Sequence, residues 1–137
     1  MATYQKYQNF VEDVLKGVHN FSSHSLLMSL HNTAPVATNT VFANLTEISA
    51  GNGYSAGGAA LDSVTLSETS GTAKLVIADE VITASGGSIG PFRYPNFYNT
   101  TPTSPADPLI CFFDYGSSIT LLDTETFTAD LDASNGL

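Results

Sequence analysis

The sequence predicts a mainly β protein: an antiparallel β-sandwich or jelly-roll-like barrel with one amphipathic α-helix near the N-terminus. Two observations support this prediction. About eight short apolar segments follow one another, separated by turns rich in Gly, Pro and Asn. Charged residues make up only 12% of the chain, and Ser, Thr, Asn and Gly fill the polar positions, which suits pleated strands and tight turns.

Residues 4–18 carry the one helical pattern. Apolar residues that recur at steps of three and four fall on one face of a helix; they are Tyr7, Phe10, Val11, Val14, Leu15 and Val18. Thr3 suits the N-cap, and Gly17 or Asn20 marks the end. Because an apolar helical stripe usually faces its own core, we expect this helix to pack on its own sheet. Docking on a neighbouring subunit is the alternative.

Four segments between residues 25 and 82 are predicted to contain strands. They span residues 25–32, 41–48, 59–68 and 73–82. The first ends before Pro35, which stops a strand ladder, and the last is open to a break at Asp79-Glu80. The Gly-rich loop 49–58 contains Asn52-Gly53, a strong turn dipeptide.

Residues 84–122 hold a dense group of aromatic residues and are predicted to form the core. Two aromatic-rich segments flank a loop of Thr, Pro and Asp and supply about three more strands. Residues 124–132 alternate polar and apolar positions, which predicts a half-buried strand before a turn at residues 134–136. The 137 residues are expected to form one domain (1–137), with a helix at about 4–18 and a β-rich part from about 24 to 137.

The net charge of −9 argues against two classes of partner. Binding to phosphate backbones relies on clustered Lys and Arg, and the only such residues are Lys6, Lys16, Lys74 and Arg93. We therefore expect no nucleic-acid partner. The same shortage of cations argues against an anionic membrane surface.

Cys111 is the only cysteine, so no internal disulfide is expected. It lies in an apolar run (109–113), which favours a small buried side chain over a reactive thiol. The first 20 residues contain acids and lack the apolar core of a signal peptide, and no apolar run reaches membrane-spanning length. We expect synthesis in a cytoplasm and no membrane insertion.

Residue patterns give no catalytic, cofactor or metal site. His19, His24 and His31 lack zinc-ligand spacing. The glycines of 51–57 lie between β segments rather than in a strand–helix unit, so they predict a turn and not a dinucleotide site. The acids from Asp130 onward resemble the start of a calcium loop but lack the later bidentate acid. We expect no catalytic residues, no cofactor and no metal, and therefore no enzyme.

Arg93 lies between two aromatic residues, Phe92 and Tyr94. On a strand, its side chain would point away from both of them. Two interpretations remain open: a solvent-side or stacked guanidinium, or an intersubunit ion pair with one of the six acids that follow it.

Four segments resemble a known family. They are YxxFVEDxxxGVHNF (7–21), LHNTAPVATNTVxANxTEIxAGNGYxAGG (30–58), AxGGxIGPFRY (84–94) and DPLIxxxDYGSSITLxDxExFTxDxDxxNG (107–136), where x marks a position that is not part of the resemblance. They cover nearly the whole chain, which resembles small virion structural proteins of tailed bacteriophages. The resemblance implies a capsid-associated decoration (cement) protein, or a comparable tail or neck component, and supplies no catalytic residues.

A decoration protein would bind the outer surface of the phage head and clamp adjacent capsomers through several weak contacts at once. The expected partners are the major capsid protein and further copies of the chain, as a homo-oligomer and most simply a trimer. The expected location is the virion capsid surface, after synthesis in the bacterial cytoplasm. The candidate intersubunit contacts come from the N-terminal segment, the Gly-rich loop and the single arginine: Tyr7, Phe10, Val14, Asn52, Tyr54 and Arg93.

Two alternatives remain open. A tail-tube, neck or fibre-attachment component would assemble with itself through paired β edges. A carbohydrate-binding module for host recognition would use exposed aromatic rings such as Tyr54 or Tyr98, although the absence of Trp counts against it.

Overall fold

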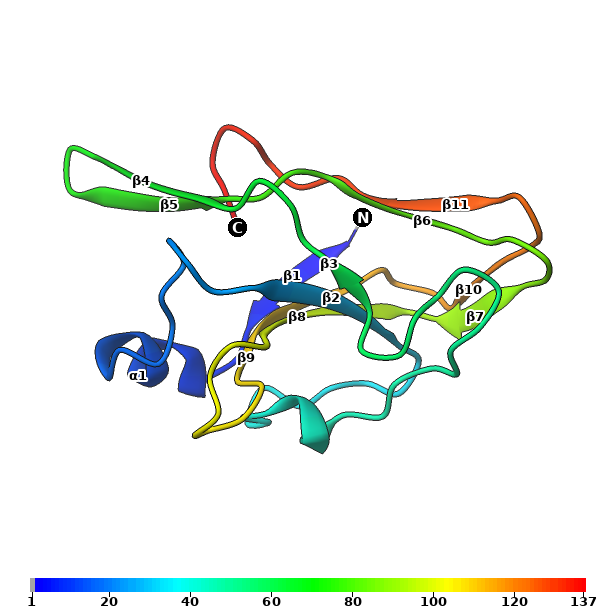
Figure 1. The fold of residues 1–137 in the computed structure, drawn as a ribbon, viewed down its shortest axis with the longest axis horizontal. Helices are drawn as coiled ribbons and strands as arrows, with labels where there is room; N and C mark the ends of the chain where they lie inside the picture. The colour runs from blue at the N-terminus through cyan, green and yellow to red at the C-terminus, as the bar shows by residue number, and fades with distance from the viewer. Residues whose placement is uncertain (1) are drawn as a thin grey trace.

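The computed structural model describes residues 2–137 and has the predicted fold class. The chain is mainly β, with antiparallel sheets and one α-helix, and it is sandwich-like. The sheets do not close into a barrel, so the sandwich is the correct one of the two predicted architectures. Figure 1 shows one layer of strands lying above a second, with α1 at one end.

The elements are short and are joined by many turns. In chain order they are β1 (Thr3–Lys6), α1 (Asn9–Leu15), β2 (Leu26–His31), the 3-10 helix η1 (Phe42–Asn44), β3 (Ala59–Ala60), β4 (Thr65–Thr69), β5 (Thr72–Val76), β6 (Glu80–Thr83), β7 (Ile89–Phe92), β8 (Tyr94–Asn99), β9 (Leu109–Asp114), β10 (Ile119–Leu121) and β11 (Thr126–Ala129).

The larger layer is a five-stranded sheet with the order β1-β9-β8-β2-β3. All its pairings are antiparallel, and the central strands β8 and β9 come from the aromatic-rich block. This confirms that residues 84–122 supply the middle of the fold. They contribute four strands rather than about three, because β7 and β8 are separate elements around Arg93.

The second layer consists of two strand pairs, the β4–β5 hairpin and β6 with β11. Figure 1 shows this layer above the five-stranded sheet, with the β4–β5 hairpin projecting over α1. A third pair, β7 with β10, lies at the opposite end of the molecule from α1 (Figure 1). The predicted break in 73–82 is present, because β5 ends at Val76 and β6 begins at Glu80.

The five-stranded sheet has a core on each of its faces, because successive side chains of a strand point to opposite sides. Leu26, Met28, Leu30 and Phe97 belong to the larger cluster, which also takes in Leu131 from the second layer. The smaller cluster joins Tyr7, Tyr98, Leu109 and Phe112, and is covered by partly buried residues that include Phe42 and Leu45. The loop around η1 therefore acts as a cover for the second face.

The predicted helix at 4–18 is wrong at its start. Residues Thr3–Lys6 form the edge strand β1, and Thr3 pairs with Asp114 of β9 instead of capping a helix. Tyr7 is fully buried against Phe112, with ring centroids 5.1 Å apart. Strand pairing and burial of this one aromatic ring therefore determine the structure of residues 4–8, although the spacing of the apolar residues there fits a helix.

Helix α1 ends at Leu15, and Gly17, with a φ of +76°, marks the exit of the chain from the helix as predicted. Gly17 N–H donates to Val14 C=O and Val18 N–H donates to Asp13 C=O, which is the Schellman pattern. The expected inward apolar stripe is only partly correct. Phe10 and the buried Asp13 face the domain, whereas Val11, Val14 and Leu15 remain exposed on α1, which is seven residues long.

The strand predicted at 41–48 is also wrong. This segment forms η1 and makes only isolated bridges, Val41 to Pro108 and His31 to Glu47. Asn44 explains the change, because its side-chain oxygen accepts hydrogen bonds from the backbone N–H groups of Thr40 and Val41. Such local bonds compete with strand pairing.

The remaining predicted strands are present in shorter form. The segment 25–32 contains β2, 59–68 contains β3 and all of β4 except Thr69, and 124–132 contains β11. Within residues 2–137, no helix is long and apolar enough to cross a lipid bilayer.

Candidate interaction surface

An apolar groove runs along one side of the sandwich, between the β1–β9 side of the sheet and β11. It comprises two adjoining cavities of about 310 and 280 Å³ that share Phe113, Asp130 and Leu131. We call it the edge groove. Its other lining residues are Ala2, Tyr4, Pro95, Phe97, Tyr115, Phe127, Thr128, Ala129, Asp132, Gly136 and Leu137.

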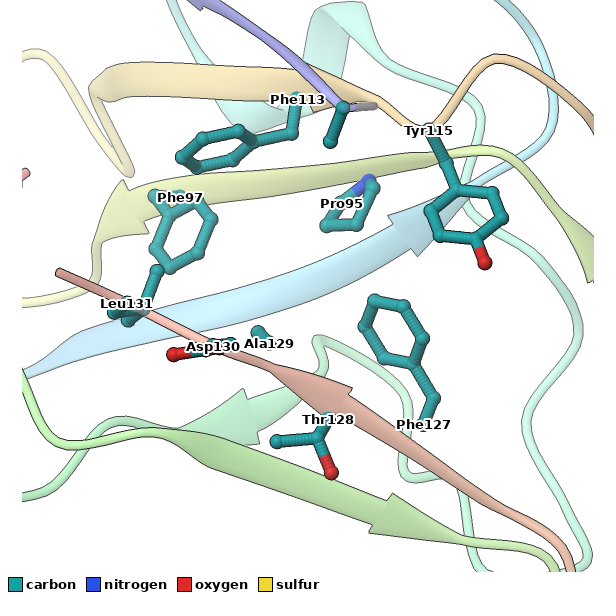
Figure 2. Close-up of a pocket in the computed structure, with 10 residues that line it drawn as sticks. Pro95, Phe97, Phe113, Tyr115, Phe127, Thr128, Ala129, Asp130 and Leu131 are labelled. Carbon is teal, nitrogen blue, oxygen red and sulfur yellow. The ribbon is translucent and has the colours of Figure 1, made fainter.

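Aromatic rings form most of the floor of the edge groove. Figure 2 shows Phe97 and Phe113 on neighbouring strands of the sheet, and Phe127 of β11 with its ring toward Pro95 and Tyr115. The rings of Phe97 and Phe113 meet edge to face with centroids 5.7 Å apart. The rings of Tyr115 and Phe127 lie 6.4 Å apart in a similar arrangement. Edge-to-face packing of this kind fixes the shape of the floor.

A second apolar surface lies at the end of the molecule that carries α1. Val11, Val14 and Leu15 on the helix are 46%, 41% and 83% exposed, and Leu66 on the β4–β5 hairpin is 50% exposed. We call these four residues the end patch. Val14 and Leu66 line the same cavity of about 430 Å³, so the helix and the hairpin face one another across it. Side chains this apolar and this exposed are typical of contacts with other molecules.

The N-terminal candidate contacts divide between the core and the surface. Tyr7 is fully buried, and its hydroxyl donates to Asn96 Oδ1 inside the chain. Phe10 is half-buried and packs near His19 and Phe21. Val14 is the candidate that remains open to a neighbour.

The Gly-rich loop 49–58 is held tightly by its own chain. Asn52 and Gly53 both have positive φ (55° and 100°), which is the predicted two-residue turn, and Asn52 Nδ2 donates to Ser88 C=O. Tyr54 is 4% exposed; its hydroxyl donates to Glu47 Oε1 at 2.6 Å and accepts from Leu30 N–H at 2.8 Å. Burial raises the pKa of this phenol. Asn52 is therefore exposed at the turn, and Tyr54 is a core residue.

The aromatic rings proposed for sugar binding are not on the surface. Tyr98 is 3% exposed, and its hydroxyl donates to Gly57 C=O at 2.6 Å. Its ring stacks on that of Phe42 with centroids 4.4 Å apart. Burial raises its pKa to about 12. The expectation that Tyr54 and Tyr98 offer exposed faces to a carbohydrate is wrong.

Arg93 pairs with an acid from the predicted segment, but in its own chain. Its Nε lies 2.6 Å from Asp114 Oδ1, and its Nη2 lies 2.9 Å from Asp114 Oδ2. The guanidinium carbon also lies 5.2 Å from the centre of the Tyr94 ring. Because both carboxylate oxygens are used within the chain, the geometry gives no support to an intersubunit pair for Arg93.

Two histidines meet at one buried amide. Asn99 Nδ2 donates to Nδ1 of His24 at 2.9 Å and lies 3.1 Å from Nδ1 of His19. His19 is stacked on Phe21, and its Nε2 is buried with no hydrogen-bond partner among residues 2–137. Burial lowers the pKa of His19, which favours the neutral ring. Across the part of the chain that the structure describes, no His, Cys, Asp and Glu side chains gather in a group that could hold a metal ion.

Cys111 is fully buried in the larger core cluster, as the sequence predicts. Burial raises the pKa of its thiol. The side chain is therefore a packing element and lacks the exposed thiolate that a reactive cysteine needs.

Sequence reasoning missed both the edge groove and the end patch. The groove draws on β1, β8, β9, β11 and the C-terminal turn, and only the fold brings these together. The alternation of Phe127, Ala129 and Leu131 was the available signal, because it marks one inward face of a strand. It does not show that the strand has an open edge.

Comparisons with protein-family models, curated proteins and solved structures found no match to this chain.

Proposed function

We propose that the chain is a non-enzymatic structural protein of a tailed-phage virion, a decoration protein that binds the outer surface of the head. Support comes from the sequence segments that resemble virion structural proteins and from the exposed apolar surfaces of the fold. The observation that carries the proposal is the end patch. Four large apolar side chains are exposed on a short helix and a projecting hairpin, two elements with little packing of their own.

The shape of these two elements favours contact with a large partner. A two-stranded hairpin alone is marginally stable in water, so β4–β5 gains stability when a partner covers it. The helix and the hairpin lie at the same end of the molecule (Figure 1). Both line one cavity. A single partner surface can therefore cover both. Several such contacts around a shell add up through multivalency.

Cryo-EM of decorated shells tests the proposal. Purified protein is mixed with emptied, mature capsids of the phage that encodes the chain, and the expected result is ordered density over threefold or quasi-threefold positions. Leu15→Asp places a charge on the most exposed apolar side chain, so it should strip the shells of this density. Leu122→Asp is the matched control, because Leu122 is 60% exposed and follows β10, which lies at the opposite end of the molecule from α1 (Figure 1). Bare shells with the native protein would overturn the proposal.

The tail or neck alternative is favoured by one observation, the free strand edges of the sandwich. Strands β1 and β3 lie at the two edges of the five-stranded sheet. Edges of this kind template self-assembly. Closed rings or tubes of the purified protein in negative-stain micrographs would favour this function, whereas a small oligomer that binds shells favours decoration.

A further inference from the structure

The edge groove has an unpaired strand edge along one wall. Within the described part of the chain, β11 pairs with β6 alone. An antiparallel ladder uses the polar backbone groups of alternate residues on each edge, so the other edge of β11 keeps N–H and C=O groups free. These groups can bond an additional strand.

The lining of the groove shows that this free edge faces it. Five consecutive residues, Phe127 to Leu131, line the larger cavity. Phe127, Thr128 and Ala129 belong to β11, and Asp130 and Leu131 follow it. Side chains of consecutive strand residues point to opposite faces, so three strand residues in a row line a cavity only where the edge of the strand forms its wall. The lining residues include none from β6 among residues 2–137, which places β6 on the far side of β11.

The depth of the groove suits alternate apolar side chains. Leu131 points toward Phe97 of the sheet and Phe127 toward Pro95, while Thr128 points away (Figure 2). The four residues of β11 span about 14 Å. A segment of similar length added to β11 would place every second side chain over the aromatic floor, where burial of apolar surface stabilises it.

The charges around the groove select the occupant. Asp130 and Asp132 line it, and Glu125 lies beside Phe127 in the neighbouring surface hollow. A second copy of the chain carries a net charge of −9. Of its four cations, Arg93 is paired with Asp114 and Lys16 with Glu12, which leaves Lys6 and Lys74, and Lys74 donates to the Ser134 carbonyl. A second copy would thus place further acidic side chains beside the acidic side chains of the groove. A basic segment of another protein has the complementary charge.

We propose that the edge groove binds an extended segment of a different protein, in which apolar residues alternate with Lys or Arg, and that this segment joins β11 as an added strand. Backbone hydrogen bonds to β11 supply the geometry, apolar side chains fill the aromatic floor, and the basic residues meet Asp130 and Asp132. This inference concerns the isolated chain and does not depend on its function at the head, so the two proposals can fail separately.

Peptide binding to the full-length protein tests the inference. The probes are fluorescein-labelled peptides of about seven residues that alternate lysine with valine, leucine, isoleucine or phenylalanine. Fluorescence anisotropy should show binding of at least one basic peptide, and replacement of its lysines by glutamate should weaken binding at least about tenfold. Absence of binding by all basic peptides would overturn the proposal.

Backbone methylation distinguishes an added strand from loose apolar or ionic contact. Two versions of the best peptide carry N-methyl groups on alternate residues, one on the odd and one on the even positions. An added strand has one bonded edge, so one version should lose at least about tenfold in affinity and the other should bind nearly as the parent. Equal effects of the two versions would contradict strand addition.

Variants and NMR locate the site. Asp130→Lys reverses an exposed charge at the groove and should weaken binding several-fold. Asp62→Lys is the matched control, since Asp62 is exposed and follows β3, at the opposite edge of the sheet from β1. Amide shifts on peptide addition should concentrate in residues 126–132. Shifts confined to other strands, or a dimer of the native protein that Asp130→Lys dissociates, would overturn the proposal.

Discussion

Arg93 and Asp114 join two neighbouring stretches of chain through a two-point contact, with Nε to Oδ1 at 2.6 Å and Nη2 to Oδ2 at 2.9 Å. The backbone reinforces this contact, because Tyr115 N–H donates to Arg93 C=O and Arg93 N–H donates to His31 C=O. Asp114 Oδ1 also accepts from Gly116 N–H. The only arginine of the chain therefore fixes the turn that follows β9, beside the edge groove.

The ion pair predicts a shift in the titration of Asp114. Hydrogen bonds from Arg93, then from Gly116 N–H, lower the pKa of the Asp114 carboxyl. A carboxyl whose pKa is lowered by folding stabilises the protein at pH values above its pKa in the unfolded chain. This contribution is lost as the pH falls through the folded pKa. In Arg93→Gln, the pKa of Asp114 should rise, as followed by carbon-detected NMR of the carboxyl group. An unchanged pKa in a monomeric sample would contradict an intramolecular pair.

Adding a single methyl group at Gly58 is expected to reduce the stability of the fold more than at other glycines. Gly58 has a φ of +98°, and a Cβ there would lie 2.1 Å from the carbonyl oxygen of Met28. Gly58→Ala should lower the free energy of unfolding by about 3 kcal/mol, from backbone strain and displacement of β2 together. Urea denaturation followed by circular dichroism measures this change.

Gly71→Ala is the control for Gly58→Ala. Gly71 has a φ of +83° in the β4–β5 turn, but a Cβ there meets no atom within 4 Å. Its substitution adds strain without a clash, and it should cost about 1 kcal/mol. Equal losses in the two variants would show that the close approach of Gly58 to β2 is unimportant.

The strands were predictable where side chains alternate or where an apolar run has clear turn boundaries. Residues 126–129 and 26–31 follow these rules and form β11 and β2. The Asn52-Gly53 turn was also predictable, because Gly and Asn accept positive φ with little strain. These features depend on a few neighbouring residues, and local sequence determines them.

The errors arise where a distant partner decides the structure. The spacing of Tyr7, Phe10 and Val14 fits a helix, yet Tyr7 packs on Phe112 and residues 3–6 pair with β9. Segment 41–48 has strand-forming residues, but Asn44 bonds the local backbone and the segment covers the sheet. The edge groove was hidden for the same reason, since the sequence does not show which edges remain unpaired.

We expect the thiol of Cys111 to react only after the protein unfolds. It is fully buried, and burial raises its pKa, so both access and thiolate formation are suppressed. With a disulfide reagent at pH 8, the native protein should react at least about a thousandfold more slowly than the protein in guanidinium, since reaction requires opening of the core. Rapid reaction of the native protein would show that the core near β9 opens readily.

We expect titration of His19 to make the folded protein less stable in mild acid. Burial lowers the pKa of His19 below the usual 6.5, although nearby Asp13 opposes this shift. The unfolded chain then binds the proton more readily than the folded one. The contribution of neutral His19 to stability is therefore fully present above the pKa of histidine in the unfolded chain. It is lost as the pH falls from about 6.5 through the folded pKa, at up to about 1.4 kcal/mol per pH unit for one proton.

Replacement of His19 by phenylalanine separates this effect from other titrations. His19 stacks on Phe21 with an angle of 8° between the rings, so a phenyl ring keeps the packing and removes the titrating nitrogen. His19→Phe should flatten the dependence of unfolding free energy on pH between about 6.5 and 5, measured by urea denaturation at each pH. His31, whose pKa burial also lowers, remains in this variant and accounts for the residual slope. An unchanged slope in His19→Phe would assign the acid sensitivity to other groups, because the phenyl side chain cannot take up a proton.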